Sequence, residues 1–326
     1  MSTDASRLIS ALRSSPFWNS PSDVCACDKG PTIAGLDLVW YYRKYRQELD
    51  REFSIDGIVA YYLAGRRANV TSPNLAFDEF WYLQRYRDAD QAVKKNRYVS
   101  GWEHYLAEGA ENRLNPAFWF DERWYARQNA DVALALREGR IVCGFEHYLR
   151  EGVHTDSLPS IYFNSAWYRN QYLSGDEDRR VPIIEYLSAK PKRRLNPVPF
   201  FDEEWYANQY FGKNDNEAHP ALSSYEHYIF IGRSRSHSPS PNFNEAEYRT
   251  RYPEVTRSII EGKYSSAMEH YATEGVINGY VATGHLHQGA LDYRTPKIVQ
   301  AYEQSLTLNL KQAADLRQLV RDAQKP

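Results

Sequence analysis

The stretch Ala76–Pro116 reads AFDEFWYLQRYRDADQAVKKNRYVSGWEHYLAEGAENRLNP, and most of the chain is built from versions of it. A second version starts at Phe118 and reads FWFDERWYARQNADVALALREGRIVCGFEHYLREG. Three weaker versions and one degenerate version begin at Ile161, Phe200, Asn242 and Leu36. Repetition with a period of about 20–50 residues is typical of repeat architectures, in which each copy buries its apolar face against its neighbours.

Two anchors define the period. The first is an aromatic pair, which recurs as Trp40-Tyr41, Trp81-Tyr82, Trp124-Tyr125, Trp167-Tyr168 and Trp205-Tyr206, and finally as Glu247-Tyr248. The second is His-Tyr, which starts at His104, His147, His227 and His270, with Tyr61-Tyr62 and Glu185-Tyr186 as weaker forms. Both anchors recur about every 42 residues. We therefore predict an N-terminal extension, six copies and a C-terminal segment, with boundaries 1–35, 36–74, 75–117, 118–160, 161–198, 199–241, 242–283 and 284–326.

Each copy is predicted to form two helices. The first begins at an Asp or Asn such as Asp78, whose side chain can cap the free backbone N–H groups. A glutamate such as Glu79 follows in the first turn, where the helix dipole favours a negative charge. In the third copy, Asp121→Ala is therefore expected to cost more stability than Glu122→Ala.

The second helix begins with a capping box, in which Ser100 precedes Glu103 by three residues. It ends at a glycine, which is expected to adopt the left-handed conformation after the helix. These glycines are Gly65, Gly109, Gly152, Gly232 and Gly275. A single helix pair cannot bury its own apolar face. The pattern therefore predicts an all-α fold, an α-solenoid of about six helix-pair repeats.

The two flanks read differently from the repeats. Asp4–Leu12 is predicted to form a short helix, and Asn19–Gly35 a loop. Thr295–Ala323 is predicted to form an amphipathic helix because its apolar residues are three and four apart. These residues are Val299, Tyr302, Leu306, Leu310, Ala313, Leu316 and Val320. We favour a capping role for this helix on the last repeat, with self-association to a second chain as the alternative.

Composition and targeting signals narrow the function. The formal net charge of -2 gives no electrostatic footprint for nucleic acid. Three cysteines, Cys25, Cys27 and Cys143, form neither a disulfide framework nor a usual zinc spacing, so we assign them structural or incidental roles. The N-terminus lacks the pattern of a secretory signal, and no apolar run reaches about 18 residues. A cytoplasmic protein without a membrane span is expected.

The histidines of the second anchor are the residues most suggestive of chemistry. One histidine per copy would place neighbouring rings roughly 10 Å apart, too far to share a zinc ion whose bonds are about 2 Å. We favour a ring wedged between helices and hydrogen-bonded to a carbonyl or a tyrosine. Asp88-Ala-Asp90 resembles the Asp-x-Asp of nucleotide-sugar transferases, but Asp131 occupies the same place in the next copy, so a local helical role is predicted. No catalytic, cofactor or metal site is predicted.

Aromatic residues are the candidates for binding. Adjacent rings on a helix point about 100° apart, so one of each Trp-Tyr pair is expected in the core and the other in a groove. Aromatic side chains dominate protein-binding hot spots and also stack on sugars. The candidate binding surface is assigned to Trp102, Tyr86, Phe145, Tyr172, Tyr210 and Tyr225.

The unit FDexWYxxxYxDv…ehYxxxGxxexRxnP resembles a repeat of bacterial proteins that synthesise extracellular polysaccharide, often beside glycosyltransferase domains, and of some large secreted bacterial proteins. The match is carried by Phe77-Asp78, Trp81-Tyr82, Asp88, Glu103-His104-Tyr105, Gly109, Glu111, Arg113 and Pro116, and by their equivalents. It covers about three quarters of the chain, and the flanks of roughly 35 and 43 residues are too short for a nucleotide-binding domain.

The resemblance therefore implies an accessory protein rather than a transferase. We expect a scaffold or adaptor that binds a protein partner, for instance a glycosyltransferase. A carbohydrate-binding repeat protein is the alternative, and an enzyme with an unrecognised site is the third interpretation.

Overall fold

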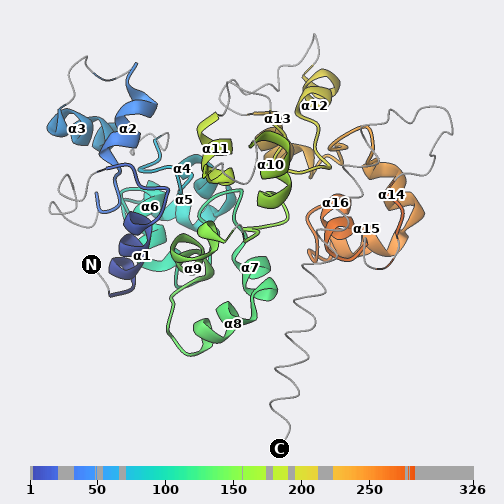
Figure 1. The fold of residues 1–326 in the computed structure, drawn as a ribbon, viewed down its shortest axis with the longest axis horizontal. Helices are drawn as coiled ribbons and strands as arrows, with labels where there is room; N and C mark the ends of the chain where they lie inside the picture. The colour runs from blue at the N-terminus through green and yellow to red at the C-terminus, as the bar shows by residue number, and fades with distance from the viewer. Residues whose placement is uncertain are drawn as a thin grey trace, which may run out of the picture. The chain divides into compact units, whose positions relative to one another are not determined.

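The computed structural model describes residues 3–20, 33–47, 49, 54–65, 71–155, 157–173, 179–189, 195–211, 223–275, 278 and 280–282. Within these ranges the chain forms 16 α-helices and contains no β-strand (Figure 1). The prediction of an all-α fold is confirmed. Among the helices described here, none has the length and apolar character needed to cross a membrane.

The helices follow the copies in order. The N-terminal extension supplies α1 (Thr3–Ser14). The first three copies supply α2 (Leu38–Tyr45), α3 (Ile55–Gly65), α4 (Glu79–Arg85), α5 (Arg87–Lys94), α6 (Gly101–His104), α7 (Glu122–Gln128), α8 (Ala130–Arg137) and α9 (Gly144–Arg150). The last three supply α10 (Ser165–Tyr172), α11 (Pro182–Ala189), α12 (Glu203–Tyr210), α13 (Ser224–His227), α14 (Glu245–Arg251), α15 (Pro253–Ile260) and α16 (Ala267–His270). Short π turns extend α6, α13 and α16 as η3 (Tyr105–Gly109), η5 (Tyr228–Gly232) and η6 (Tyr271–Gly275), and the 3-10 turn η4 (Gly152–His154) follows α9.

The helix pair predicted for each copy is a three-helix unit in the second, third and sixth copies. The expected first helix breaks at Tyr86, Asn129 and Tyr252, where the backbone is extended with ψ values of 93°, 101° and 79°. At Tyr252 the cause is Pro253, because a proline disfavours the helical conformation of the residue before it. We call α5, α8 and α15, which follow these breaks, the middle helices.

The predicted N-caps are confirmed. In every copy an Asp or Asn side chain accepts a hydrogen bond from the backbone N–H three residues later, at 2.7 Å for Asp121 and 2.9 Å for Asp78 and Asn164. In the first five copies, the backbone N–H of the same residue donates to a proline carbonyl near the end of its own copy, as Asp121 does to Pro159 at 3.1 Å. The cap residue therefore both starts the first helix and ties the two ends of the copy together.

The core of each copy is aromatic. The tyrosine of the first anchor is at most 1% exposed in all six copies. In the last five copies it packs between a phenylalanine before the cap and the tyrosine of the second anchor. In the second copy, Tyr82 lies 5.1 Å from Phe77 and 5.7 Å from Tyr105, measured between ring centroids. This repeated packing accounts for much of the high tyrosine content of the chain.

The chain divides into two compact units, Met1–Ser160 and Ile161–Pro326. The division falls between the third and fourth copies, so each unit holds three copies. One contact recurs at the same place in both units. In the first unit the indole N–H of Trp102 donates to the carbonyl of Ala34 at 2.6 Å, and in the second the hydroxyl of Tyr225 donates to the carbonyl of Tyr162 at 2.5 Å.

The predicted N-terminal helix is present as α1, which packs against α9 and η3 in the first unit. Its apolar face is buried, and Arg7 lies 3.5 Å from the carboxylate of Glu146. The ring of Phe17 stacks on that of Trp119 at 5.3 Å. Cys25, Cys27, most of the predicted N-terminal loop and the predicted C-terminal helix lie outside the described residues.

Candidate functional site

The repeated histidines are bonded to the repeated tyrosines. The Nδ1 atom of the histidine lies 2.8 to 3.0 Å from a tyrosine hydroxyl in four copies. The pairs are Tyr82 with His104, Tyr125 with His147, Tyr206 with His227, and Tyr248 with His270. The prediction of a histidine held between helices by a tyrosine is confirmed. Each bond fixes the second helix of a copy against the first.

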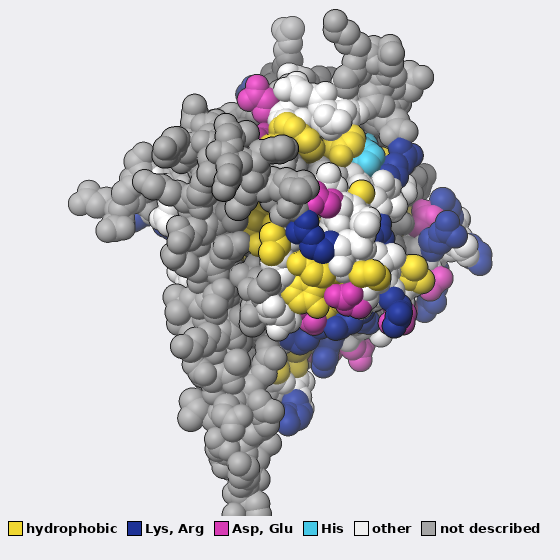
Figure 2. All heavy atoms as spheres, turned by 90° about the vertical axis from the view of Figure 1, so that its right-hand side faces the viewer, with side chains coloured by type: hydrophobic (Ala, Val, Ile, Leu, Met, Phe, Trp, Pro, Cys, Tyr) yellow, Lys and Arg dark blue, Asp and Glu magenta, His cyan; other side chains and the backbone are white. Residues whose placement is uncertain are grey.

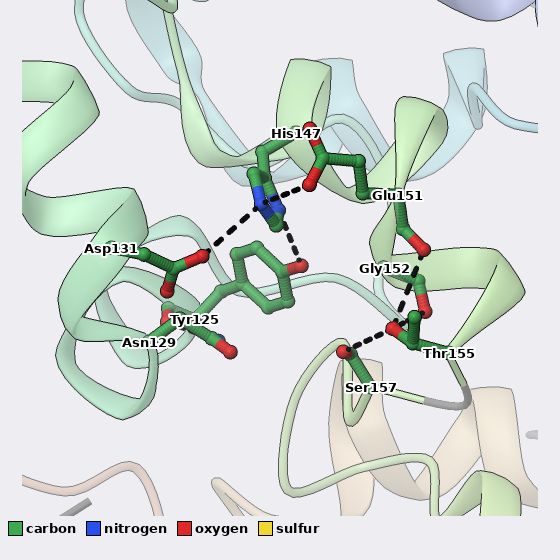
Figure 3. A network of polar contacts seen from close by, with 8 residues as sticks. All are labelled: Tyr125, Asn129, Asp131, His147, Glu151, Gly152, Thr155 and Ser157. Atoms are coloured by element: carbon green, nitrogen blue, oxygen red, sulfur yellow. Dashed lines mark hydrogen bonds and ion pairs between the residues drawn. The ribbon is translucent and has the colours of Figure 1, made fainter. Parts of the chain in front are cut away.

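In the third copy the histidine also faces two carboxylates (Figure 3). The Nε2 atom of His147 lies 3.5 Å from Asp131, in the first turn of α8, and 3.4 Å from Glu151, which follows α9. Nε2 facing two acceptors carries the proton, so Nδ1 accepts the hydrogen bond from the hydroxyl of Tyr125. The Asp131 side chain is 74% exposed and that of Glu151 is 68% exposed, so both contacts are weak.

Burial favours the neutral form of the corresponding histidines of the second and sixth copies. Burial lowers the pKa of His104 and of His270 below the usual value, although nearby carboxylates act in the opposite direction. For His104 one of these is Glu108, whose carboxylate lies 3.8 Å from Nε2. A neutral ring suits the bond to tyrosine, because a protonated Nδ1 could not accept it.

The glycines that end the second helices leave room for the tyrosine–histidine hydrogen bond. The prediction that these glycines adopt the left-handed conformation is wrong. Among the described glycines, positive φ occurs at Gly35, Gly139 and Gly262. A Cβ atom at Gly275 would lie 2.6 Å from the hydroxyl of Tyr248, and the equivalent atoms in three other copies would lie closer still. Glycine is therefore required so that the tyrosine hydroxyl can reach the histidine.

A glutamate directly after the cap residue forms a second recurring site. Glu79, Glu122, Glu203 and Glu245 are at most 6% exposed. Both carboxylate oxygens of Glu122 accept backbone N–H bonds, from Gly144 at 2.7 Å and Phe145 at 2.8 Å. These are the first two residues of α9, whose N–H groups have no partner inside the helix. The glutamate therefore caps a different helix of its copy, a role that the predicted interaction with the dipole of its own helix does not include.

Burial and hydrogen bonding act against each other on these carboxyl groups. Burial raises the pKa of Glu79, Glu122 and Glu203 to about 7 and that of Glu245 to about 6, while the two backbone N–H donors favour the charged form. Each of these carboxylates bonds the protein's own backbone. This structural role explains why the glutamate recurs, and no substrate-binding role is needed to explain it.

The six aromatic residues assigned to a binding surface fall into two groups. Trp102, Phe145 and Tyr225 are at most 1% exposed, so their assignment to the surface is wrong. The hydroxyls of the other three, which are partly buried, accept backbone N–H bonds from the end of the same copy. The acceptors are Tyr86 for Asn115 at 2.8 Å, Tyr172 for Asn196 at 3.1 Å and Tyr210 for Ser238 at 2.9 Å.

Sequence reasoning missed the roles of the buried glutamate and of this second tyrosine. Both carry a recognisable signal, since each recurs at a fixed distance from the Trp-Tyr pair. The tyrosine stands five residues after the tryptophan position, as Tyr45, Tyr86, Tyr172, Tyr210 and Tyr252. A polar residue that recurs at the same position of each repeat, with no catalytic or metal-binding group beside it, is typical of a contact that determines the fold.

The remaining candidates for chemistry are metal ligands, a thiol and an Asp-x-Asp pair. Across the described residues, no three His, Cys, Asp or Glu side chains are grouped in a way that could hold a metal ion. Cys143 is buried at the N-cap position of α9, and burial raises the pKa of its thiol well above the usual value. Asp88 and Asp90 lie in the first turn of α5, as a local helical role predicts. Comparison of the chain with protein-family models, curated proteins and solved structures finds no match.

Proposed function

We propose that this chain is a non-catalytic helical-repeat protein that binds a protein partner as a scaffold or adaptor, with its copies stacked as an α-solenoid. The observation that carries the proposal is that the recurring polar side chains form hydrogen bonds within the fold. The histidine of each pair bonds a tyrosine, and the buried glutamate caps a helix. The repeated residues therefore have structural roles. We propose that exposed residues, which differ between copies, determine which partner is bound.

The middle helices carry such differences. Gln91, Leu134 and Arg257 occupy the same register on α5, α8 and α15. Leu134 is 40% exposed, and Ile260, at the end of α15, is 79% exposed. Variation at exposed positions on a constant frame suits recognition of one particular protein surface.

Charge gives no reason to prefer a nucleic acid. The face in Figure 2 shows lysine and arginine side chains among aspartate and glutamate, with separate apolar patches between them. A nucleic-acid surface would instead gather positive charge on one side. A protein partner with its own mixed polar and apolar surface fits this pattern better.

The setting we propose rests on the resemblance of the repeat unit. We propose a cytoplasmic accessory to bacterial surface-polysaccharide synthesis, with a glycosyltransferase as the partner. Carbohydrate binding is the alternative, but it has a weaker basis. Three tryptophans of the aromatic pairs, Trp81, Trp124 and Trp167, are 6% exposed and offer no open ring face to a sugar.

The test is affinity capture from native cell lysate with the full chain as bait. Leu134→Asp and Ile260→Asp should reduce capture of the partner, while Gln84→Asp, at an exposed position of α4 outside the middle helices, should leave it unchanged. Circular dichroism and thermal melts should show that all three variants fold. A partner retained equally by every variant would reject the middle helices as the binding surface. Saturable binding of the cell's purified glycan, with no protein retained, would reject the scaffold in favour of carbohydrate binding.

A further inference from the structure

A hydrogen bond holds the end of five of the six copies. The hydroxyl of the tyrosine at the C-terminal end of the first helix, either its last residue or the next one, accepts the backbone N–H of a residue in the exit loop, at distances from 2.8 to 3.1 Å. The pairs are Tyr45 with Ser72, Tyr86 with Asn115, Tyr172 with Asn196, Tyr210 with Ser238, and Tyr252 with Val281. We call this bond the exit latch.

A second hydrogen bond joins one copy to the next. The side chain of the same exit residue accepts the backbone N–H of the first residue of the following helix. The pairs are Ser72 with Glu79 at 3.0 Å, Asn115 with Glu122 at 2.9 Å, Asn196 with Glu203 at 2.9 Å, and Ser238 with Glu245 at 3.2 Å. We call this bond the entry latch. Together the two latches fix the exit loop to the helices on both sides of it.

The third copy lacks the chemistry for both latches. Asn129 replaces the tyrosine, and its side-chain N–H₂ donates to the carbonyl of Tyr125 at 2.8 Å. Leu158 replaces the exit residue, so no side-chain oxygen is present to accept the N–H of Ser165. Both departures come together in one copy. That copy is the last of the first compact unit, which ends at Ser160.

Three hydrogen bonds close to this point each lie within one unit. The carbonyl of Pro159 accepts the N–H of Asp121 at 3.1 Å, and the hydroxyl of Ser160 donates to the carbonyl of Trp119 at 2.8 Å. On the far side, the N–H of Asn164 donates to the carbonyl of Pro197 at 3.1 Å. These bonds hold each side to its own unit, and the chain passes from one unit to the other between Ser160 and Asn164.

We propose that this connection is a joint between two three-copy modules, which open and unfold separately because both latches are missing there. The joint requires no ligand and does not depend on the proposed partner. It predicts that local opening at the third exit loop is easier than at the others, since fewer bonds must break.

Hydrogen exchange on the full chain tests the joint directly. The amides of Leu158 and Ser165 should exchange at least about ten-fold faster than those of Asn115 and Glu122, which the latches bind in the second copy. Thermal unfolding should show two separate transitions. Equal protection at the two sets of amides, or a single cooperative transition, would overturn the proposal.

Reciprocal variants then test whether the latches are the cause. Asn129→Tyr with Leu158→Asn installs both groups and should slow exchange at residues 158 and 165 about ten-fold. Tyr86→Asn with Asn115→Leu removes both groups from the second copy and should speed exchange at residues 115 and 122 by a similar factor. If the first variant misfolds, the second still decides. Unchanged exchange at residues 115 and 122 would show that the latches do not set the strength of the connection.

Discussion

Removing the buried carboxylate of the third copy should cost more stability than removing the helix cap beside it. Glu122→Ala leaves the N–H groups of Gly144 and Phe145 buried without an acceptor. An unsatisfied buried donor costs about 1–3 kcal/mol, so two should cost about 2–6 kcal/mol. Asp121→Ala removes one N-cap bond, which is typically worth about 1 kcal/mol. The expected order is the reverse of the one that the sequence alone suggests.

Urea denaturation of the full-length variants, followed by circular dichroism, measures this order. Ser165→Ala is the matched control, because Ser165 stands at the equivalent position of the fourth copy and has no carboxylate. It should cost less than about 1 kcal/mol, within the usual range for changes that break no such network. A loss for Glu122→Ala equal to or smaller than that for Asp121→Ala would refute the assignment of Glu122 as a cap for α9.

Three further predictions follow from the same contacts. Burial raises the pKa of Glu122 from 4.5 to about 7. Its contribution to the free energy of unfolding is therefore full below about pH 4.5 and is lost as the pH rises through about 7. Urea melts at pH 4.5 and 8 should show this loss in the unmodified chain, and Glu122→Gln should reduce it. Gly152→Ala should cost about 1–3 kcal/mol because its Cβ would overlap the hydroxyl of Tyr125, and Tyr125→Phe in the same chain should recover part of that loss in a double-mutant cycle. Dialysis against a chelator should leave the thermal midpoint unchanged, and stoichiometric zinc that survives purification would contradict the structural role of His104 and His147.

The features that could be predicted from the sequence are those with short-range causes. The cap at Asp121 bonds the N–H of Trp124, three residues away, so the spacing alone reveals it. The carboxylate of Glu122 instead bonds groups 22 and 23 residues away, and no local rule connects them. The sequence pattern suggests a local reason for the glycine at position 152, a left-handed turn. The structure shows a distant reason, because a Cβ atom there would overlap the hydroxyl of Tyr125.

Left-handed residues do occur, but at other positions: at the ends of the middle helices, at Gly35, and four residues after the glycine of the second and fifth copies, at Arg113 and Ser236. Gly139 and Gly262 have φ values of 68° and 75°, and Asn96 occupies the same register in the second copy with φ of 58°. These helix ends could not be predicted from the sequence, because the break at residues such as Tyr86 leaves the period of the hydrophobic pattern nearly unchanged. The binding-surface candidates failed for a related reason. Aromatic content marks both cores and surfaces, so it could not separate Trp102 in the core from an exposed residue.

The two copies without the buried glutamate support its assigned role. In the fourth copy Ser165 takes its place, and the residue it would cap is Pro182, which has no N–H to satisfy. In the first copy Leu38 takes its place, and the equivalent N–H belongs to Ile58, which bonds the carbonyl of Ser54 at 3.0 Å because α3 begins three residues earlier. The carboxylate is thus absent where the first N–H group it would serve is missing or already bonded. A residue kept only for the dipole of its own helix would show no such dependence on the next helix.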